Sequence, residues 1–243
     1  MILNRYLITV SYDGSKFYGF QRLKDQNTVQ KRIEDALSKI NKSPVVIKGA
    51  GRTDRGVHAM RQRCHFDLNI KIDAGRLKTA IDNAVGEYIS IKECKKVDLD
   101  FHARFCVKRK EYLYKINIGE YEPTLEDYTL QINYKLNMTK MRECAKVFVG
   151  EHNFASFVCG KRDNYNGTIY SIKIKKIDNM IYINFVGKSF YQYMVRNLVG
   201  AILEVGKGKA EVIEIKKMLD SEEENVVIPT VKPNGLYLID IEY

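Results

Sequence analysis

GRTDRGVHA, residues 51–59, is the stretch around which the rest of this sequence is organised. Its two glycines, Gly51 and Gly56, let the backbone turn tightly and approach a ligand closely. Between them lie two arginines and the carboxylate of Asp54, and nearby positive charge keeps a carboxylate ionised at neutral pH. Such a group suits a nucleophile or an electrostatic stabiliser better than a general acid. An aspartate that simply caps a turn fits these nine residues equally well.

The composition points to a polyanionic partner. The 243 residues include 40 Lys and Arg against 30 Asp and Glu, a net charge of +10. This excess favours nucleic acid over a membrane surface, although a basic protein with a generally solvated surface would carry the same charge. The five cysteines form no CxxC pair, which favours reduced thiols over disulfides or a zinc ribbon. His58, Cys64 and His65 do not match a metal-ligand spacing, so no metal site is expected.

No targeting or membrane segment is evident. No apolar run approaches the ~18–20 residues of a membrane span. Residues 1–5 lack the apolar region of a signal peptide. These features predict a cytoplasmic protein that does not associate with membranes.

Hydrophobic periodicity predicts an α+β fold with helices on one face of a sheet. Strands are expected at 6–12, 45–48, 62–68, 89–92, 101–107, 111–116, 172–175, 182–185 and 235–239. Helices are expected to start at the capping patterns Asn27–Gln30, Asp73, Thr139 and Ser189–Gln192, with a short fifth helix over 212–219. Two halves of similar element order predict a domain over 1–107, carrying Asp54, and a second over 108–243, with a cleft between them.

Two residues of the second half stand out chemically. Tyr112 lies on a predicted strand just after a basic cluster, and a tyrosine can accept a proton or stack on a base. Arg196 lies on a predicted helix, and a guanidinium can hold a carboxylate in a bidentate manner. The structural alternatives are a tyrosine that only packs and an arginine that only forms a surface ion pair. Residues 16–22 mix aromatic and basic groups, a combination that suits either base stacking with phosphate binding or ordinary core packing.

At these residues the sequence resembles the TruA family of tRNA pseudouridine synthases, nearly end to end. Eight matching pieces in the same order carry the resemblance, at 12–21, 28–30, 49–59, 100–104, 112–116, 154–157, 194–200 and 233–238. The piece centred on Asp54, GAGRTD followed by GVHA one residue later, is highly specific.

The resemblance implies the pseudouridine synthase fold: two pseudo-duplicated ferredoxin-like halves with antiparallel sheets, helices on one face and a basic cleft between. It also implies an isomerase that converts uridine to pseudouridine without cofactor or metal, acting as a homodimer that binds RNA across both subunits. The tRNA anticodon arm is the expected substrate. The alternatives are the same chemistry on ribosomal RNA, and a non-catalytic RNA-binding or chaperone protein that keeps the fold.

The resemblance also implies roles for individual residues. Asp54 would be the nucleophile, and Arg196 would pair with it and hold it ionised. Tyr112 would stack on the target base and serve as the proton-removing group. Arg52 would contact the flipped-out nucleotide or its phosphates, and Leu236 would pack under the base.

The sequence departs from the family pattern around the site. Phe20 stands where the family usually has Trp, Arg55 where it has Ala, and Gly167 where it has Arg. The segment 119–132 is shorter than usual. We expect Arg55 to contact substrate RNA rather than to tune the chemistry.

Overall fold

The structure is a computed structural model that describes residues 3–223 and 229–243. Two of the residues 1–5, which were searched for a signal peptide, therefore lie outside the described residues. The chain divides into two compact units, one of Met1–Lys108 with Tyr237–Tyr243 and the other of Arg109–Leu236. Within the described residues no helix has the length and apolar character needed to cross a membrane.

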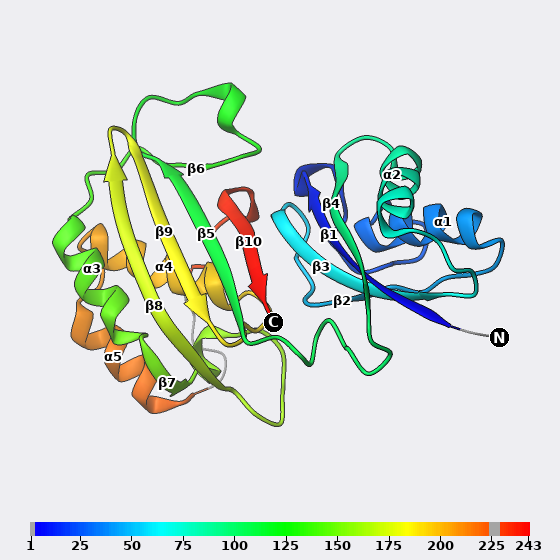
Figure 1. The fold of residues 1–243 in the computed structure, drawn as a ribbon. Helices are drawn as coiled ribbons and strands as arrows, with labels where there is room; N and C mark the ends of the chain where they lie inside the picture. Colours follow the sequence, from blue (N-terminus) through cyan, green and yellow to red (C-terminus); the bar gives the residue numbers. More distant parts are fainter. Residues whose placement is uncertain (1–2, 224–228) are drawn as a thin grey trace. The chain divides into compact units, whose positions relative to one another are not determined.

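The first unit is a sheet with two helices packed against each other on one face (Figure 1). Its elements in chain order are β1 (Asn4–Tyr12), α1 (Val29–Asn41), β2 (Lys48–Gly49), β3 (His58–Leu68), α2 (Ala74–Val85) and β4 (Ile89–Val97). This β-α-β-β-α-β order is that of a ferredoxin-like unit. β1 lies between β4 and β3, and both pairs are antiparallel. β3 continues from the 51–59 turn, so the sheet fixes one end of the turn.

The second unit repeats this theme with three helices on one face of a four-stranded sheet, in the order β5-β9-β8-β7 (Figure 1). The elements are β5 (Arg109–Asn117), β6 (Leu130–Gln131), α3 (Met138–Val147), β7 (Gly150–Asn153), β8 (Asn166–Ile177), β9 (Met180–Gly187), α4 (Met194–Gly206) and α5 (Val212–Ser221). α4 packs on α3 and is buried along nearly its whole length.

The α+β class and the mostly antiparallel sheets are confirmed, and two strand pairs are parallel. β6 runs parallel to β5, and β10 (Leu236–Glu242) runs parallel to β3. The predicted second domain extended to residue 243, whereas all of β10 after Leu236 belongs to the first unit. The physical reason is local contact: the ring of Tyr237 stacks on His58 at a centroid distance of 4.6 Å.

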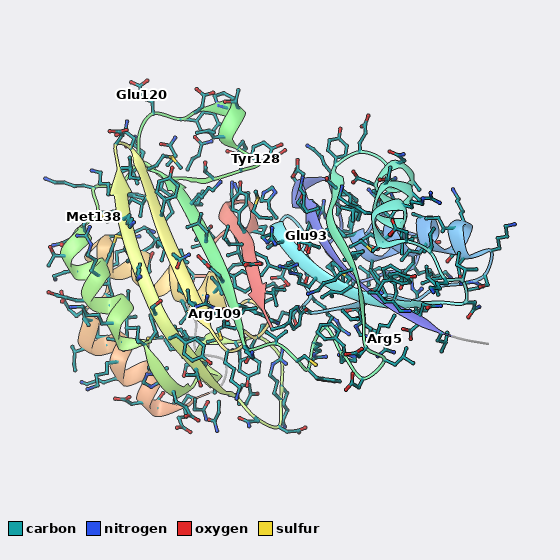
Figure 2. The ribbon with its side chains drawn as sticks, in the orientation of Figure 1. Arg5, Glu93, Arg109, Glu120, Tyr128 and Met138 are labelled. Carbon is teal, nitrogen blue, oxygen red and sulfur yellow. The ribbon has the colours of Figure 1, made fainter. Side chains whose placement is uncertain are left out.

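An ion-pair network also ties β10 to the first unit. Arg61 and Arg63 of β3 each contact both Glu93 of β4 and Asp240 of β10, at 2.8 to 3.4 Å. Glu93, labelled in Figure 2, is the member of this network that β4 contributes. The hydrogen bond from Arg61 lowers the pKa of Glu93 to about 2, so this carboxylate stays ionised in the network.

The predicted caps of three helices were wrong. α3 begins at Met138 and is capped by Asn137, whose side chain accepts from the N–H of Lys140, so Thr139 lies inside the helix. α1 is capped by Thr28, whose hydroxyl accepts from the backbone of Lys31, whereas the side chain of Asn27 donates to the carbonyl of Lys16. α4 begins at Met194, well after Ser189, and Tyr193 precedes it in the left-handed region at φ 61°. At α1 the contact of Asn27 with Lys16 overrode the local capping signal.

Two predicted strands also differ. Of the strand predicted over 45–48, only Lys48 is in β2. Residues 101–107 turn instead of extending: the N–H groups of Phe105 and Cys106 both donate to the carbonyl of His102. The N–H of Ala103 donates to Nδ1 of the buried His65 at 3.1 Å, so this backbone donor is satisfied by a side chain and not by a strand.

We expect His65 to make the first unit sensitive to acid. Burial, followed by the charge of the neighbouring His102, lowers the pKa of His65 from 6.5 to about 4. Between these two pH values the unfolded chain binds a proton that the folded chain does not, so stability falls as the pH drops from 6.5 to 4. The loss is on the order of 3 kcal/mol. Ring titration by NMR checks the pKa, and urea unfolding of wild type and His65→Gln across this range checks the linkage. A His65 midpoint near 6.5 would contradict the prediction.

Candidate active site

The 51–59 turn is held in place by hydrogen bonds to its backbone. The carbonyl of Thr53 accepts from the N–H of Phe20 at 3.0 Å, and the Thr53 hydroxyl lies 2.8 Å from the Tyr12 hydroxyl. The N–H of Val57 donates to the carbonyl of Asp54 at 3.2 Å and closes the turn. Asp54 itself is half-buried, on a backbone held by these hydrogen bonds.

Two glycines in the preceding loop allow this close packing. A Cβ on Gly19, which has φ +88°, would lie 3.0 Å from the Thr53 carbonyl oxygen and 3.2 Å from the Arg55 nitrogen. A Cβ on Gly14 would lie only 2.0 Å from the carbonyl oxygen of Val57. The loop and the turn are therefore in direct backbone contact, and only glycine fits at these two points.

Both arginines of the turn are exposed. The guanidinium of Arg55 lies over the ring of Tyr18, with its central carbon 4.3 Å from the ring centroid. Arg52, Asp54 and Arg55 thus share one turn of the first unit.

In the second unit, Tyr112 lies on β5, opposite Phe185 of β9 in the strand register. It is 8% exposed, and its ring meets Phe190 edge-on at 5.2 Å. Tyr114, two residues along the same strand and therefore on the same face, is fully buried.

Arg196 lies in the first turn of α4, and two contacts orient it. Its Nε donates to the carbonyl of Val231 at 2.8 Å, and its guanidinium lies 4.8 Å from the ring centroid of Tyr193. The left-handed backbone of Tyr193 places that ring beside the helix start.

The segment before β10 packs on the same strand. The hydroxyl of Tyr114 donates to the carbonyl of Lys232 at 2.6 Å, and a Cβ on Gly235 would lie 2.6 Å from the carbonyl oxygen of Lys115. Burial raises the pKa of Tyr114, while the positive charge of Arg196 opposes this shift. Leu236, 5% exposed, follows directly. Arg196 and the segment that carries Leu236 are thus held around Tyr114 within the second unit.

The sequence of this chain matches known proteins over almost its whole length. The family described as tRNA pseudouridine synthase matches residues 8–106 and 144–243. The chain belongs to the tRNA pseudouridine synthase family. The tRNA pseudouridine synthase A of Finegoldia magna is 41% identical over 239 residues, which are 97% of this chain and 98% of the relative. That of Pseudothermotoga lettingae is 40% identical over 246 residues, covering 99% and 100% of the two chains. The predicted resemblance to the TruA family is confirmed.

The family match covers five of the six predicted site residues. Asp54 and its neighbours lie in the first matched segment, and Arg196 and Leu236 lie in the second. Tyr112 lies between the two segments, in the part of the chain that the family description does not match. The structure places Asp54 in a different unit from Tyr112 and Arg196.

Sequence reasoning missed two supporting residues of this pseudouridine synthase. Tyr114 anchors the segment before Leu236, and Tyr193 supports Arg196. The alternation of Tyr112 and Tyr114 was visible in the sequence, but the left-handed backbone at Tyr193 had no local signal. In residues 3–223 and 229–243, no group of three or more His, Cys, Asp or Glu side chains is arranged to hold a metal ion.

Proposed function

We propose that this chain isomerises uridine to pseudouridine in structured RNA, with tRNA, at anticodon-arm uridines, as the first candidate substrate. Its relatives carry the name tRNA pseudouridine synthase A. The observation that carries the proposal is the half-buried Asp54 on a turn whose backbone is fixed by the preceding loop. A rigid backbone under a carboxylate is what a nucleophile needs, because misplacement of the reacting group costs rate.

The reaction breaks the bond from N1 of uracil to C1′ of the ribose and forms a bond from C5 to C1′. C5 loses its proton and N1 takes one up, so the product is an isomer of the substrate. A base inside a helical stack cannot be rotated in place, so the target nucleotide must first be extruded. Asp54 acts as the nucleophile of the bond exchange. Tyr112 stacks on the extruded base and removes the C5 proton.

The other residues hold the nucleotide and the carboxylate. Arg196 pairs with Asp54 and keeps it ionised, and its own orientation is set by the Val231 carbonyl and the Tyr193 ring. Arg52 and Arg55 contact the RNA, and Leu236 packs under the base. The net charge of +10 supports binding to many RNA phosphates, with an RNA affinity that falls strongly as the salt concentration rises. A cytoplasmic homodimer is part of the same proposal.

Release of tritium tests this function. RNA labelled at uracil C5 is expected to lose its label to water when the C5 proton leaves, with tRNA as the better substrate. Ribosomal RNA, labelled in the same way, tests the alternative substrate. Failure of the wild-type chain to release label from either RNA would refute the proposed activity.

We expect Tyr193→Ala to slow pseudouridine formation about tenfold, the size of one lost orienting contact of ~1.4 kcal/mol. The reason is that the Tyr193 ring supports the Arg196 guanidinium. Tyr193→Phe keeps the ring and should retain most of the rate. Single-turnover tritium release gives the rates, while tRNA affinity and the thermal midpoint show whether binding and folding are intact. Equal rates for the Ala and Phe variants would contradict this role.

A further inference from the structure

Arg55 is an exposed cation whose hydrogen-bonding groups are not used by residues 3–223 or 229–243. Its guanidinium lies over the ring of Tyr18, which is 45% exposed. No hydrogen bond or ion pair joins the Arg55 side chain to another residue in the described parts of the chain. Arg61 and Arg63 of the same unit, by contrast, are each bound to two carboxylates. Five N–H donors of Arg55 therefore remain available along the edge of a planar group.

The stacked pair is built on fixed backbone. Tyr18 donates its N–H to the carbonyl of Asn27 at 2.9 Å, and the following residue, Gly19, lies against the backbone of Asp54 and Arg55. A stacked guanidinium loses less freedom when it binds a ligand than a solvated one does, because the ring already limits its rotamers. The pair is thus a preorganised cation beside the proposed nucleophile.

A second cation–aromatic pair involves the loop that carries Tyr18. Lys16 lies over the ring of Tyr88 at 6.0 Å, and the carbonyl of Tyr88 accepts from the N–H of Asp13 at 3.0 Å. Tyr88 is 52% exposed. The loop that carries Lys16 and Tyr18 thus contributes one member to each of two cation–aromatic pairs.

We propose that Arg55, oriented by Tyr18, binds a backbone phosphate of the substrate RNA next to the target uridine. The inference rests on the proposed function, because it takes Asp54 to be the group that meets that uridine. Arg55 directly follows Asp54, and consecutive Cα atoms lie ~3.8 Å apart. Its guanidinium therefore binds a phosphate of the nucleotide next to the one that reacts. With one face covered by Tyr18, the free edge presents paired N–H donors that match two phosphate oxygens. Such a contact positions RNA without selecting its sequence.

The salt dependence of tRNA binding tests the phosphate contact. All variants are made in the Asp54→Asn chain, so that binding is measured without turnover. Arg55→Ala is expected to weaken binding several-fold and to reduce the slope of log K against log [salt] by about 0.7–0.9, the share of one phosphate. Arg55→Lys should keep the slope. Arg76→Ala, which removes the same charge from the exposed surface of α2, is the matched control. An unchanged slope for Arg55→Ala, or a change no larger than that of Arg76→Ala, would overturn the proposal.

The role of Tyr18 is tested by a double-mutant cycle. Tyr18→Leu should weaken tRNA binding when Arg55 is present and have no further effect beside Arg55→Ala, whereas Tyr18→Phe should bind as the parent does. An equal loss in both backgrounds would mean that the ring stacks on RNA directly, and would overturn the positioning role. Tritium release by the wild-type chain is measured in parallel. Release with unchanged salt slopes refutes only the phosphate contact, while absence of release refutes the proposed function itself.

Discussion

Replacing Asp54 with asparagine is expected to abolish pseudouridine formation, lowering the single-turnover rate by on the order of 10⁴-fold or more. The amide has the shape of the carboxylate but carries no charge, so it cannot act as the nucleophile or pair with a guanidinium as the carboxylate does. The turn itself should survive, because the hydrogen bonds that hold it involve backbone groups and the side chains of Thr53 and Tyr12. Tritium release from labelled tRNA measures the loss.

The control for this variant is a carboxylate of the same unit with no proposed part in the reaction. Asp35 lies on α1 and forms an exposed pair with Lys31 at 2.6 Å. Asp35→Asn removes the same charge and is expected to keep the activity, since exposed pairs contribute little. Unchanged tRNA affinity and thermal midpoint of Asp54→Asn would assign its loss to chemistry. A rate within tenfold of wild type would rule out Asp54 as the nucleophile.

The sequence predicted local features well where a single signal acted. The Asp73 cap of α2, the strands expected over 172–175 and 182–185 and the carboxylate between glycines all depend on neighbours within a few residues. The start of α1 was misplaced because Asn27 and Thr28 are both good capping residues, and only the contact of Asn27 with Lys16 decides between them.

Long-range features were beyond local patterns. The strand predicted over 235–239 is present as β10, but its pairing with β3 was not predicted, because alternation does not identify a partner. The strand expected over 101–107 failed since His65, far away in the sequence, accepts the N–H of Ala103. At the site, the family resemblance identified Asp54, Tyr112 and Arg196. The contacts that hold these residues join parts of the chain far apart in sequence, so local patterns could not predict them.

Gly14→Ala is expected to cause the largest loss of stability among single substitutions near the turn. The added methyl carbon would lie 2.0 Å from the carbonyl oxygen and 2.3 Å from the carbonyl carbon of Val57. These are backbone atoms, so the loop or the turn must move, and the N–H of Gly14 would then lose its 3.1 Å bond to Nδ1 of the buried His58. Overpacking of this kind together with a lost buried hydrogen bond costs about 3 kcal/mol or more.

Activity should fall more steeply than stability alone requires, because the displaced backbone is the one that carries Asp54. Urea unfolding gives the stability change, and tritium release at a temperature where the variant is still folded gives the rate. Gly75→Ala is the matched control, since its added methyl would meet only a flexible oxygen of Asp73, at 3.2 Å, and should change stability by less than about 1 kcal/mol. If Gly14→Ala matched this control in both measurements, the loop would not be what holds the turn. Contacts other than those of the Gly14 loop would then have to hold Asp54 in place.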